Sequence, residues 1–300
     1  MCGIVGLFLK DRGLDSRLGG MLGSMLESLA DRGPDSAGFA VYGEGRPDRV
    51  KISVHAGRDR ASFEKLASAA AIALDCEIAS EVRASHCVFS VPNEAFDPML
   101  AWLAVRAPDA FVAGAGHRVE IFKDVGHPYD VAERFDLASM SGTHAIGHTR
   151  MATESAVSRD GAHPFSTGLD QCLVHNGSLS NHNSVRRRLH HDGVRVDTDN
   201  DSEVAAAYLT WRMGQGMDLA AALAAAPRDL DGFYTFVVGT ESGFGVLRDP
   251  IACKPAVMAE TDAYVAFGSE YRALVALPGI DAARLWEPDP AKAYFWERAR

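Results

Sequence analysis

Apolar residues follow two different periods along this chain. Residues 2–9 are rich in Ile, Val, Leu and Phe, which is typical of a buried strand. From Leu18 to Leu29 the apolar positions recur every three or four residues and predict one face of an α-helix. The segment Arg32-Gly33-Pro34-Asp35 then stops that helix.

Shorter apolar runs bounded by turn residues predict further strands, and longer runs, some rich in Ala, predict helices. The expected strands cover residues 39–42, 50–54, 87–91, 119–123, 144–148, 171–175, 233–238, 243–247, 255–259 and 264–267, with the turn 43–47 joining the first two. The expected helices cover residues 62–74, 95–106, 180–189, 202–212, 219–225 and 269–276. Blocks of strands alternate with blocks of helices, so the pattern favours a layered α+β fold in a single domain, residues 1–300.

Composition narrows the class of partner. The 300 residues are 47% hydrophobic and 23% charged, within the ordinary globular range. Thirty basic and forty acidic residues give a net charge of -10, which repels nucleic acid and anionic lipid. No segment approaches the roughly 20 apolar residues that cross a bilayer, and the first residues lack the features of a secretory leader. We therefore expect a cytoplasmic protein that binds neither nucleic acid nor membrane.

The cysteines and histidines do not form a metal-binding pattern. The five cysteines are scattered, without a CxxC pair: Cys2, Cys76, Cys87, Cys172 and Cys253. We expect reduced thiols and neither a metal nor an iron–sulfur cluster in this chain. His190 and His191 are adjacent, so on a helix they point to different faces, and the polar run 186–192 predicts a solvated surface. A Cys87–His86 pair is rejected as well.

Cys2 is a candidate nucleophile. A small second residue permits removal of Met1, which would give this cysteine a free α-amine. An α-amino group has a reference pKa of roughly 7.7–8.0 and a thiol of roughly 8.5, so near neutral pH such an amine accepts the thiol proton. No catalytic histidine is then required. Taken by position alone, Cys2 could equally be a small buried hydrophobe in a strand.

Several motifs accompany Cys2 in a fixed order. They are Met-Cys-Gly-Ile-Val-Gly at residues 1–6, Arg-Gly-Pro-Asp-Ser-Ala-Gly at 32–38, Gly-His-Thr-Arg-Met-Ala-Thr at 147–153, His-Pro-Phe at 163–165, Val-His-Asn-Gly at 174–177, Asp-Ser-Glu at 201–203, Asp-Gly-Phe at 231–233 and Arg-Asp-Pro at 248–250. In this set the chain resembles the class II glutamine amidotransferases. The resemblance implies a four-layer αββα N-terminal nucleophile hydrolase sandwich, with residues of about 44–141 as a family-variable insertion.

The resemblance also implies a role for each matched residue. Cys2 attacks the side-chain amide of glutamine, and Asn176 with the backbone N–H of Gly177 stabilises the resulting oxyanion. Arg150, supported by Thr153, binds the α-carboxylate. Asp201 accepts from the α-ammonium, with Asp199 as the other candidate, and His163 shapes the substrate loop.

Three of these residues have simpler interpretations. Arg150 could form a surface ion pair. Asn176-Gly177 is the commonest two-residue hairpin turn. Asp201 lies in the segment Thr198-Asp199-Asn200-Asp201-Ser202, which could cap a helix that begins at about Glu203, and capping is compatible with substrate binding.

The last expectation concerns the released ammonia. The resemblance extends to about Leu274, after which about 25 residues remain, too few for a synthase domain, so we expect a separate synthase partner and a hetero-oligomer. The long segment between the second and third motifs resembles the glutamate-synthase branch, and stand-alone subunits such as the amidotransferase subunit of N-methylglutamate synthase. That resemblance implies a partner carrying FMN and iron–sulfur clusters, with no cofactor in this chain. The alternatives are a non-catalytic scaffold of the same fold and an amidohydrolase for another amide.

Overall fold

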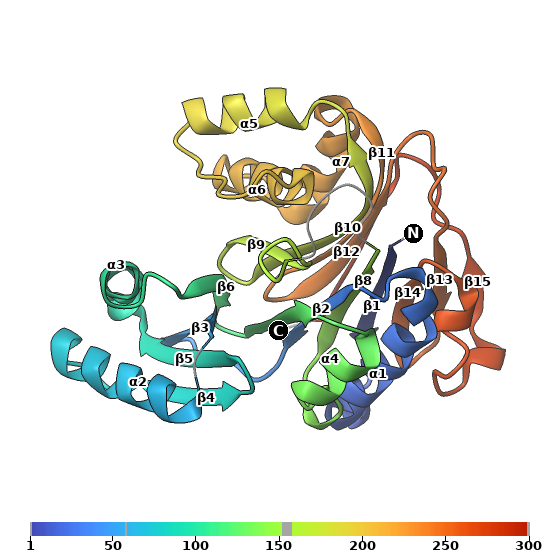
Figure 1. Cartoon of the computed structure of the whole chain (residues 1–300). Coiled ribbons are helices and arrows are strands. Elements are labelled where there is room, and N and C mark those ends of the chain that lie inside the picture. The colour runs from blue at the N-terminus through green and yellow to red at the C-terminus, as the bar shows by residue number, and fades with distance from the viewer. Residues whose placement is uncertain (1, 58, 152–157, 299–300) are drawn as a thin grey trace.

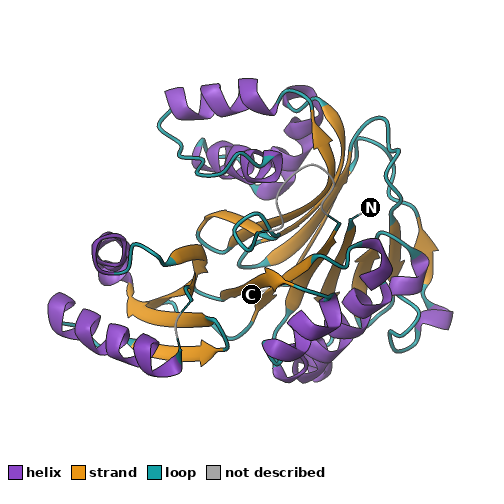
Figure 2. Cartoon of the chain, viewed as in Figure 1, coloured by secondary structure: helices purple, strands orange, loops and turns teal. Residues whose placement is uncertain are grey.

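The computed structural model describes residues 2–57, 59–151 and 158–298. Within these residues the strands form three antiparallel sheets (Figures 1 and 2). In spatial order the seven-stranded first sheet contains β15 (Arg284–Trp286), β13 (Val257–Glu260), β14 (Tyr264–Gly268), β1 (Gly3–Leu9), β8 (His144–Arg150), β2 (Ser36–Tyr42) and β7 (Val119–Val125). The five-stranded second sheet contains β16 (Ala293–Glu297), β12 (Gly243–Arg248), β11 (Gly232–Gly239), β10 (Gln171–Leu179) and β9 (Phe165–Gly168). The four-stranded third sheet contains β4 (Ala79–Arg83), β5 (His86–Pro92), β3 (Arg49–His55) and β6 (Phe111–Gly116).

Helices cover the outer faces of the sheets. The α-helices are α1 (Leu18–Ser28) and α4 (Pro128–Arg134) on the first sheet, α5 (His182–His191), α6 (Asp201–Gly214) and α7 (Leu219–Asp229) on the second, and α2 (Arg60–Leu74) and α3 (Phe96–Arg106) on the third. Short 3-10 helices occur at Arg12–Arg17, Ala30–Arg32, Asn93–Ala95, Leu137–Ser139, Tyr271–Ala273 and Ile280–Ala282.

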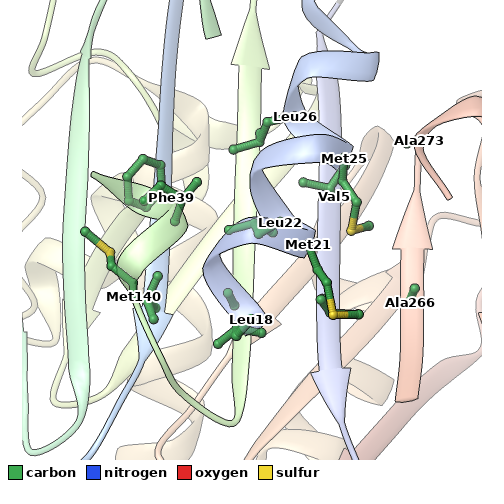
Figure 3. Packing of buried hydrophobic residues seen from close by; sticks show 14 of the residues in the cluster. Val5, Leu18, Met21, Leu22, Met25, Leu26, Phe39, Met140, Ala266 and Ala273 are labelled. Carbon is green, nitrogen blue, oxygen red and sulfur yellow. The ribbon is translucent and has the colours of Figure 1, made fainter. Parts of the chain in front are cut away.

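Alternation along β1 explains how the layers stack. Val5 and Leu7 face α1 and join the core beneath it (Figure 3), whereas Ile4 and Phe8 point the other way into the core between the first and second sheets. A third core, which includes Leu173, lies between the second sheet and its helices. The predicted four-layer αββα arrangement is confirmed, and we call these four layers the two-sheet body.

The third sheet and helices α2 and α3 form a separate layer, residues 49–116, which we call the third-sheet unit. Strands β2 and β3, joined by the turn at residues 43–47, belong to different sheets, so this turn carries the chain out of the body. Strand β7 and helix α4 return it to the first sheet. The assignment of residues of about 44–141 as a family-variable insertion stays a prediction.

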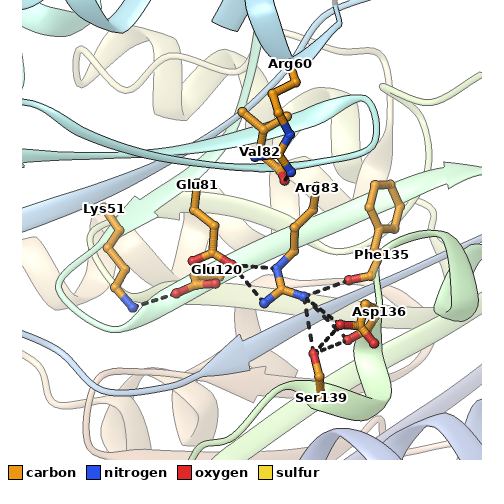
Figure 4. A network of polar contacts seen from close by, with 9 residues as sticks. All are labelled: Lys51, Arg60, Glu81, Val82, Arg83, Glu120, Phe135, Asp136 and Ser139. Carbon is orange, nitrogen blue, oxygen red and sulfur yellow. Dashed lines mark hydrogen bonds and ion pairs between the residues drawn. The ribbon is translucent and has the colours of Figure 1, made fainter. Parts of the chain in front are cut away.

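Polar contacts link the unit to the body (Figure 4). Lys51 on β3 forms an ion pair of 2.6 Å with Glu120 on β7. The guanidinium of Arg83 on β4 donates to the carbonyl oxygen of Phe135 at 3.1 Å and to the hydroxyl of Ser139 at 3.4 Å. The unit thus has its own apolar core, and charged groups form part of its connection to the body.

One predicted helix was wrong. In place of a helix over residues 269–276 the chain makes a single 3-10 turn, Tyr271–Ala273. Ser269 instead continues the pairing beside β1, because its N–H donates to the carbonyl oxygen of Ile4 at 3.0 Å and its hydroxyl accepts from the N–H of Ile4 at 2.9 Å. Glu270 is also extended, so the remaining segment is too short for a helix.

Candidate active site

Cys2 lies at the beginning of a central strand of the first sheet. Strand β1 starts at Gly3, which pairs with Thr149 of β8, and the antiparallel register therefore brings Cys2 beside Arg150. The side chain of Cys2 is partly exposed, whereas every residue of β1 that follows is buried. Cys2 thus stands where a buried central strand begins, and solvent reaches part of it.

Two side chains hold the backbone of Cys2. Its carbonyl oxygen accepts from Nε of Arg32 at 3.1 Å and from Nδ2 of Asn176 at 3.2 Å. Arg32 also forms an ion pair with Glu270, which in turn contacts Arg272 at 2.7 Å. Partial burial would raise the pKa of Glu270, but the hydrogen bond and charge of Arg32 and the charge of Arg272 lower it. The two donors therefore fix the orientation of the first residue of the site.

Asn176 and Gly177 lie inside β10, which continues to Leu179. They pair with Thr235 and Tyr234 of β11, so the hairpin interpretation was wrong. A carboxamide nitrogen has two N–H donors. One N–H of Asn176 holds the Cys2 carbonyl, and the second can donate to a substrate oxygen.

Gly177 occupies a position that excludes other residues. Its φ is +147°, and a Cβ atom there would lie 2.0 Å from the carbonyl oxygen of Phe233. Any side chain would therefore force β10 and β11 apart. The backbone next to Asn176 depends on this glycine.

Arg150 is the last residue of β8 and is buried, so it does not lie at the surface, where the simpler interpretation placed it. The motif at residues 32–38 packs against its backbone. The N–H of Asp35 donates to the carbonyl oxygen of Arg150 at 3.1 Å, and a Cβ on Gly33 would lie 2.4 Å from the Arg150 nitrogen. Two motifs more than a hundred residues apart in sequence are thus in direct contact.

Asp201 lies in the first turn of α6. One carboxylate oxygen accepts from the N–H of Leu179 at 2.8 Å, and the other lies 3.8 Å from Nδ1 of His175. The helix is capped from within the expected segment, residues 198–202, by Asn200, whose side chain accepts from the N–H of Ser202 at 2.9 Å. The side chain of Asp199 is fully exposed and lies 3.7 Å from Arg186, away from β10.

The remaining predicted residues are Thr153 and His163. Thr153 falls within residues 152–157 and so lies outside the described residues. His163 is buried, forms a cis peptide bond with Pro164, and stacks its ring on that of His148 at a centroid distance of 3.9 Å. Its ring thus lies in the interior behind the site, and direct contact with a substrate stays a prediction.

Burial keeps the histidines around the site uncharged. Desolvation lowers the pKa of His148 to about 3, and it also lowers the pKa values of His163 and His175. A neutral ring has one N–H donor and one acceptor nitrogen, and His163 and His175 each place one nitrogen 2.8 Å from the hydroxyl of Ser202.

Lys123, on β7, has a role that the sequence did not suggest. Its ammonium is fully buried and donates to the carbonyl oxygens of Asp160, Ala162 and Pro164 at 3.2, 2.9 and 3.3 Å. Burial lowers the pKa of Lys123 to about 8. This side chain anchors the segment that contains His163. Arg32 was also missed as a contact of Cys2, although it belongs to a recognised motif.

The described part of the chain also contains a cavity of about 70 Å³. The residues that line it include Phe111, Lys123, Phe165 and Glu203, and Cys2 is not among them. Within residues 2–57, 59–151 and 158–298, no cluster of three His, Cys, Asp or Glu residues could hold a metal ion. In the same residues no helix has the length and apolar character needed to cross a membrane.

Comparisons with known proteins identify the family. The glutamine amidotransferase domain family matches residues 148–276. The glutamine amidotransferase-like protein GlxB of Rhizobium meliloti (strain 1021) is 58% identical over 100% of this chain and 99% of its own length. This chain belongs to the class II glutamine amidotransferases. A putative glutamine amidotransferase of Methanothermobacter thermautotrophicus is 35% identical to this amidotransferase over 90% of the chain and 92% of its own length.

Solved structures agree with the fold of this amidotransferase. Glutamine phosphoribosylpyrophosphate amidotransferase from B. subtilis superposes with a TM-score of 0.63 at 18% identity. The match covers 99% of this chain and 47% of that one, so this chain spans about half the length of the solved enzyme. The likeness supports the N-terminal nucleophile hydrolase fold, and with it the α+β class predicted from the sequence.

Proposed function

We propose that this chain is a glutaminase subunit. It hydrolyses the side-chain amide of glutamine through a thioester on Cys2 and supplies the ammonia to a separate synthase partner. The observation that carries the proposal is the hydrogen bond of 3.2 Å from Asn176 to the Cys2 carbonyl, which joins the expected oxyanion donor to the expected nucleophile. These two residues belong to different sheets, on β10 and before β1.

The proposed reaction uses groups at the ends of neighbouring strands. With Met1 removed, the α-amine of Cys2 accepts the thiol proton, and the thiolate attacks the amide carbon. Asn176 and the backbone N–H of Gly177 stabilise the oxyanion. The amine returns its proton to the departing nitrogen, which leaves as ammonia, and water then cleaves the thioester to give glutamate.

Other residues recognise the end of glutamine opposite to its side-chain amide, namely the α-carboxylate and the α-ammonium. Arg150, with Thr153, binds the α-carboxylate, and Asp201 accepts from the α-ammonium. The burial of Arg150, and the position of Asp201 beside β10, where it accepts from the N–H of Leu179, support these roles. His163 orders the loop that covers the substrate.

The fate of the ammonia is the finer part of the proposal. We assign this chain to glutamate-synthase-like, hetero-oligomeric complexes of the cytoplasm, similar to N-methylglutamate synthase. The partner carries FMN and iron–sulfur clusters and receives the ammonia, and this chain carries no cofactor. Its free, scattered cysteines are consistent with that division, because a cluster requires grouped thiolates.

A glutaminase assay tests the catalytic role. Cys2→Ala is expected to lower glutamate release by about a thousandfold or more, because the thiolate is lost. Cys253→Ala is the matched control, since this thiol is exposed and outside the site, and it is expected to retain full activity. Mass spectrometry is expected to find a glutamine-mimicking electrophile on Cys2, with Met1 absent. Glutamate release that survives Cys2→Ala would contradict the proposal.

Two further measurements separate the alternatives. Arg150→Ala is expected to raise KM for glutamine by about tenfold to a hundredfold, because a charge-assisted hydrogen bond is lost. Unchanged glutamine hydrolysis in that variant would favour another amide as substrate. Co-purification from native cells is expected to yield a flavin-containing and iron–sulfur-containing subunit, and a complex without glutaminase activity would favour the scaffold.

A further inference from the structure

Short polar contacts connect three buried residues next to the candidate site, His163, Ser202 and His175. The hydroxyl of Ser202 lies 2.8 Å from Nε2 of His163 and 2.8 Å from Nδ1 of His175. Ser202 is buried in the first turn of α6, and both rings are buried as well. Three segments far apart in the sequence therefore meet at one oxygen atom.

The hydroxyl of Ser202 has three partners. It donates to a carboxylate oxygen of Asp201 at 3.4 Å, and its two lone pairs can accept from the two rings. If Ser202 is lost, Nε2 of His163 and Nδ1 of His175 lose this partner at the same time.

Each of the three hydrogen-bonded residues lies close to a residue of the proposed site, in the sequence or in space. His175 precedes Asn176, which holds the Cys2 carbonyl at 3.2 Å. Ser202 follows Asp201, and its hydroxyl lies 3.4 Å from that carboxylate. His163 stacks on His148, two residues before Arg150 on β8, and belongs to the segment anchored by Lys123.

We infer that Ser202 is a positioning residue of the glutamine site. By joining His163 to His175, it fixes the substrate loop, the oxyanion donor and the ammonium acceptor relative to one another. This inference rests on the proposed function. Ser202 itself touches no reacting atom, so its effect is on the geometry in which glutamine is bound.

The test compares Ser202→Ala with Ser202→Thr on the full chain with Met1 removed, in its native complex. Ser202→Ala is expected to raise KM for glutamine by about tenfold, because a small misplacement of binding groups has a large effect. It should slow labelling of Cys2 by a glutamine-mimicking chloroketone by the same factor, while labelling by iodoacetamide, which needs no glutamine pocket, is unchanged. Ser202→Thr restores the hydroxyl and should recover wild-type KM within about threefold.

Ser53→Ala is the matched control. Its hydroxyl is also buried and accepts from the N–H of Ile121 at 2.9 Å, but it lies on β3 in the third-sheet unit. This variant should keep the KM and both labelling rates of wild type. An unchanged KM in Ser202→Ala, or equal slowing by both reagents, would overturn the positioning role.

Nitrogen NMR of the histidine rings tests these contacts independently of activity. In wild type, Nε2 of His163 and Nδ1 of His175 should both give the signals of hydrogen-bonded ring nitrogens, and both signals should shift in Ser202→Ala. Ring-nitrogen signals that are the same in the two proteins would overturn the inference. Failure of the proposed function differs from this result, because it appears as wild-type protein that does not hydrolyse glutamine.

Discussion

The two-sheet body and the third-sheet unit both pack apolar side chains into a core. They differ in the polar side chains that accompany that core. In the body, buried polar groups such as Asn176, His175 and Ser202 are hydrogen-bonded at the candidate site. The third-sheet unit has an apolar core of its own, and its helices expose Ile72 and Val105. The difference teaches that packing alone does not mark the site, whereas a concentration of bonded, buried polar groups does.

The largest expected effect is on glutamine turnover. It should appear when a residue of the two-sheet body is changed, and not when a residue of the third-sheet unit is changed. Asn176→Ala should lower turnover of glutamine by about a hundredfold to a thousandfold, because one oxyanion donor and one contact to Cys2 are lost. Asn93→Ala is the control in the third-sheet unit, where the amide donates to Pro47 at 2.9 Å. Steady-state kinetics should show no change for Asn93→Ala. Equal losses in both variants would remove the distinction.

The second prediction concerns the two cores. Leu22 beneath the first sheet and Leu103 on α3 are both buried, so truncation of each to Ala should lower local stability by about 2–5 kcal/mol. Hydrogen exchange should report the loss in the matching region only. Glutaminase activity at 25 °C should fall with Leu22→Ala and stay within about twofold of wild type with Leu103→Ala. Loss of activity in Leu103→Ala would show that the unit and the body are one cooperative structure.

Acid should weaken the body through its histidines. Burial lowers the pKa values of His144 and His148 to about 3, below the usual value near 6.5 in an unfolded chain. Above pH 6.5 both states are neutral and stability is unaffected. As the pH falls from 6.5 towards 3 only the unfolded chain gains protons, so each such histidine reduces stability by about 1.4 kcal/mol per pH unit.

Urea unfolding at pH 7.5 and pH 5 checks this effect. The midpoint should be lower at pH 5. His144→Gln should reduce the dependence on pH, because it removes one group that binds a proton only in the unfolded state. A midpoint that rises on acidification would contradict the burial of neutral rings.

The smallest expected effect is at the contact between the two regions. Arg83→Ala removes the contacts to Phe135 and Ser139, but Arg83 is only partly buried and Ser139 is exposed, so the unfolding free energy should fall by about 1 kcal/mol or less. Arg46→Ala breaks an exposed pair with Asp48 and should have no measurable effect. Chemical denaturation measures both. A loss of several kcal/mol for Arg83→Ala would mean that this polar network is what holds the unit in place.

Periodicity predicted the elements with long, regular patterns. Residues 2–9 and the helix from Leu18 were predicted within a few residues, because burial on one face imposes a regular spacing. Strands β6 and β9 and helix α4 were missed, since they are short and their residues are set by neighbours from other parts of the chain. The helix expected after residue 268 failed for the same reason, because Ser269 pairs with Ile4, 265 residues away.

The motifs indicated which residues to examine but not how they are connected. Cys2, Asn176 and Arg150 were predicted from residue type and order, and their adjacency follows from strand register, which no local pattern encodes. The contacts of Arg32, Lys123 and Ser202 were missed because each depends on a partner at least 30 residues away. Residue type gives the chemistry that is possible, and only the fold gives the partners.

The position of β1 has a consequence for how the protein is made. This strand is enclosed by β8 and by β14, whose first residue is number 264, so the sheet around it closes only after that residue has been made. At about 5–20 residues per second, the ribosome needs between about 13 and 51 s to pass from Leu9 to that point. Throughout that time β1 lacks one of its two neighbouring strands. The proposed removal of Met1 thus has an interval in which the sheet beside Cys2 is still incomplete.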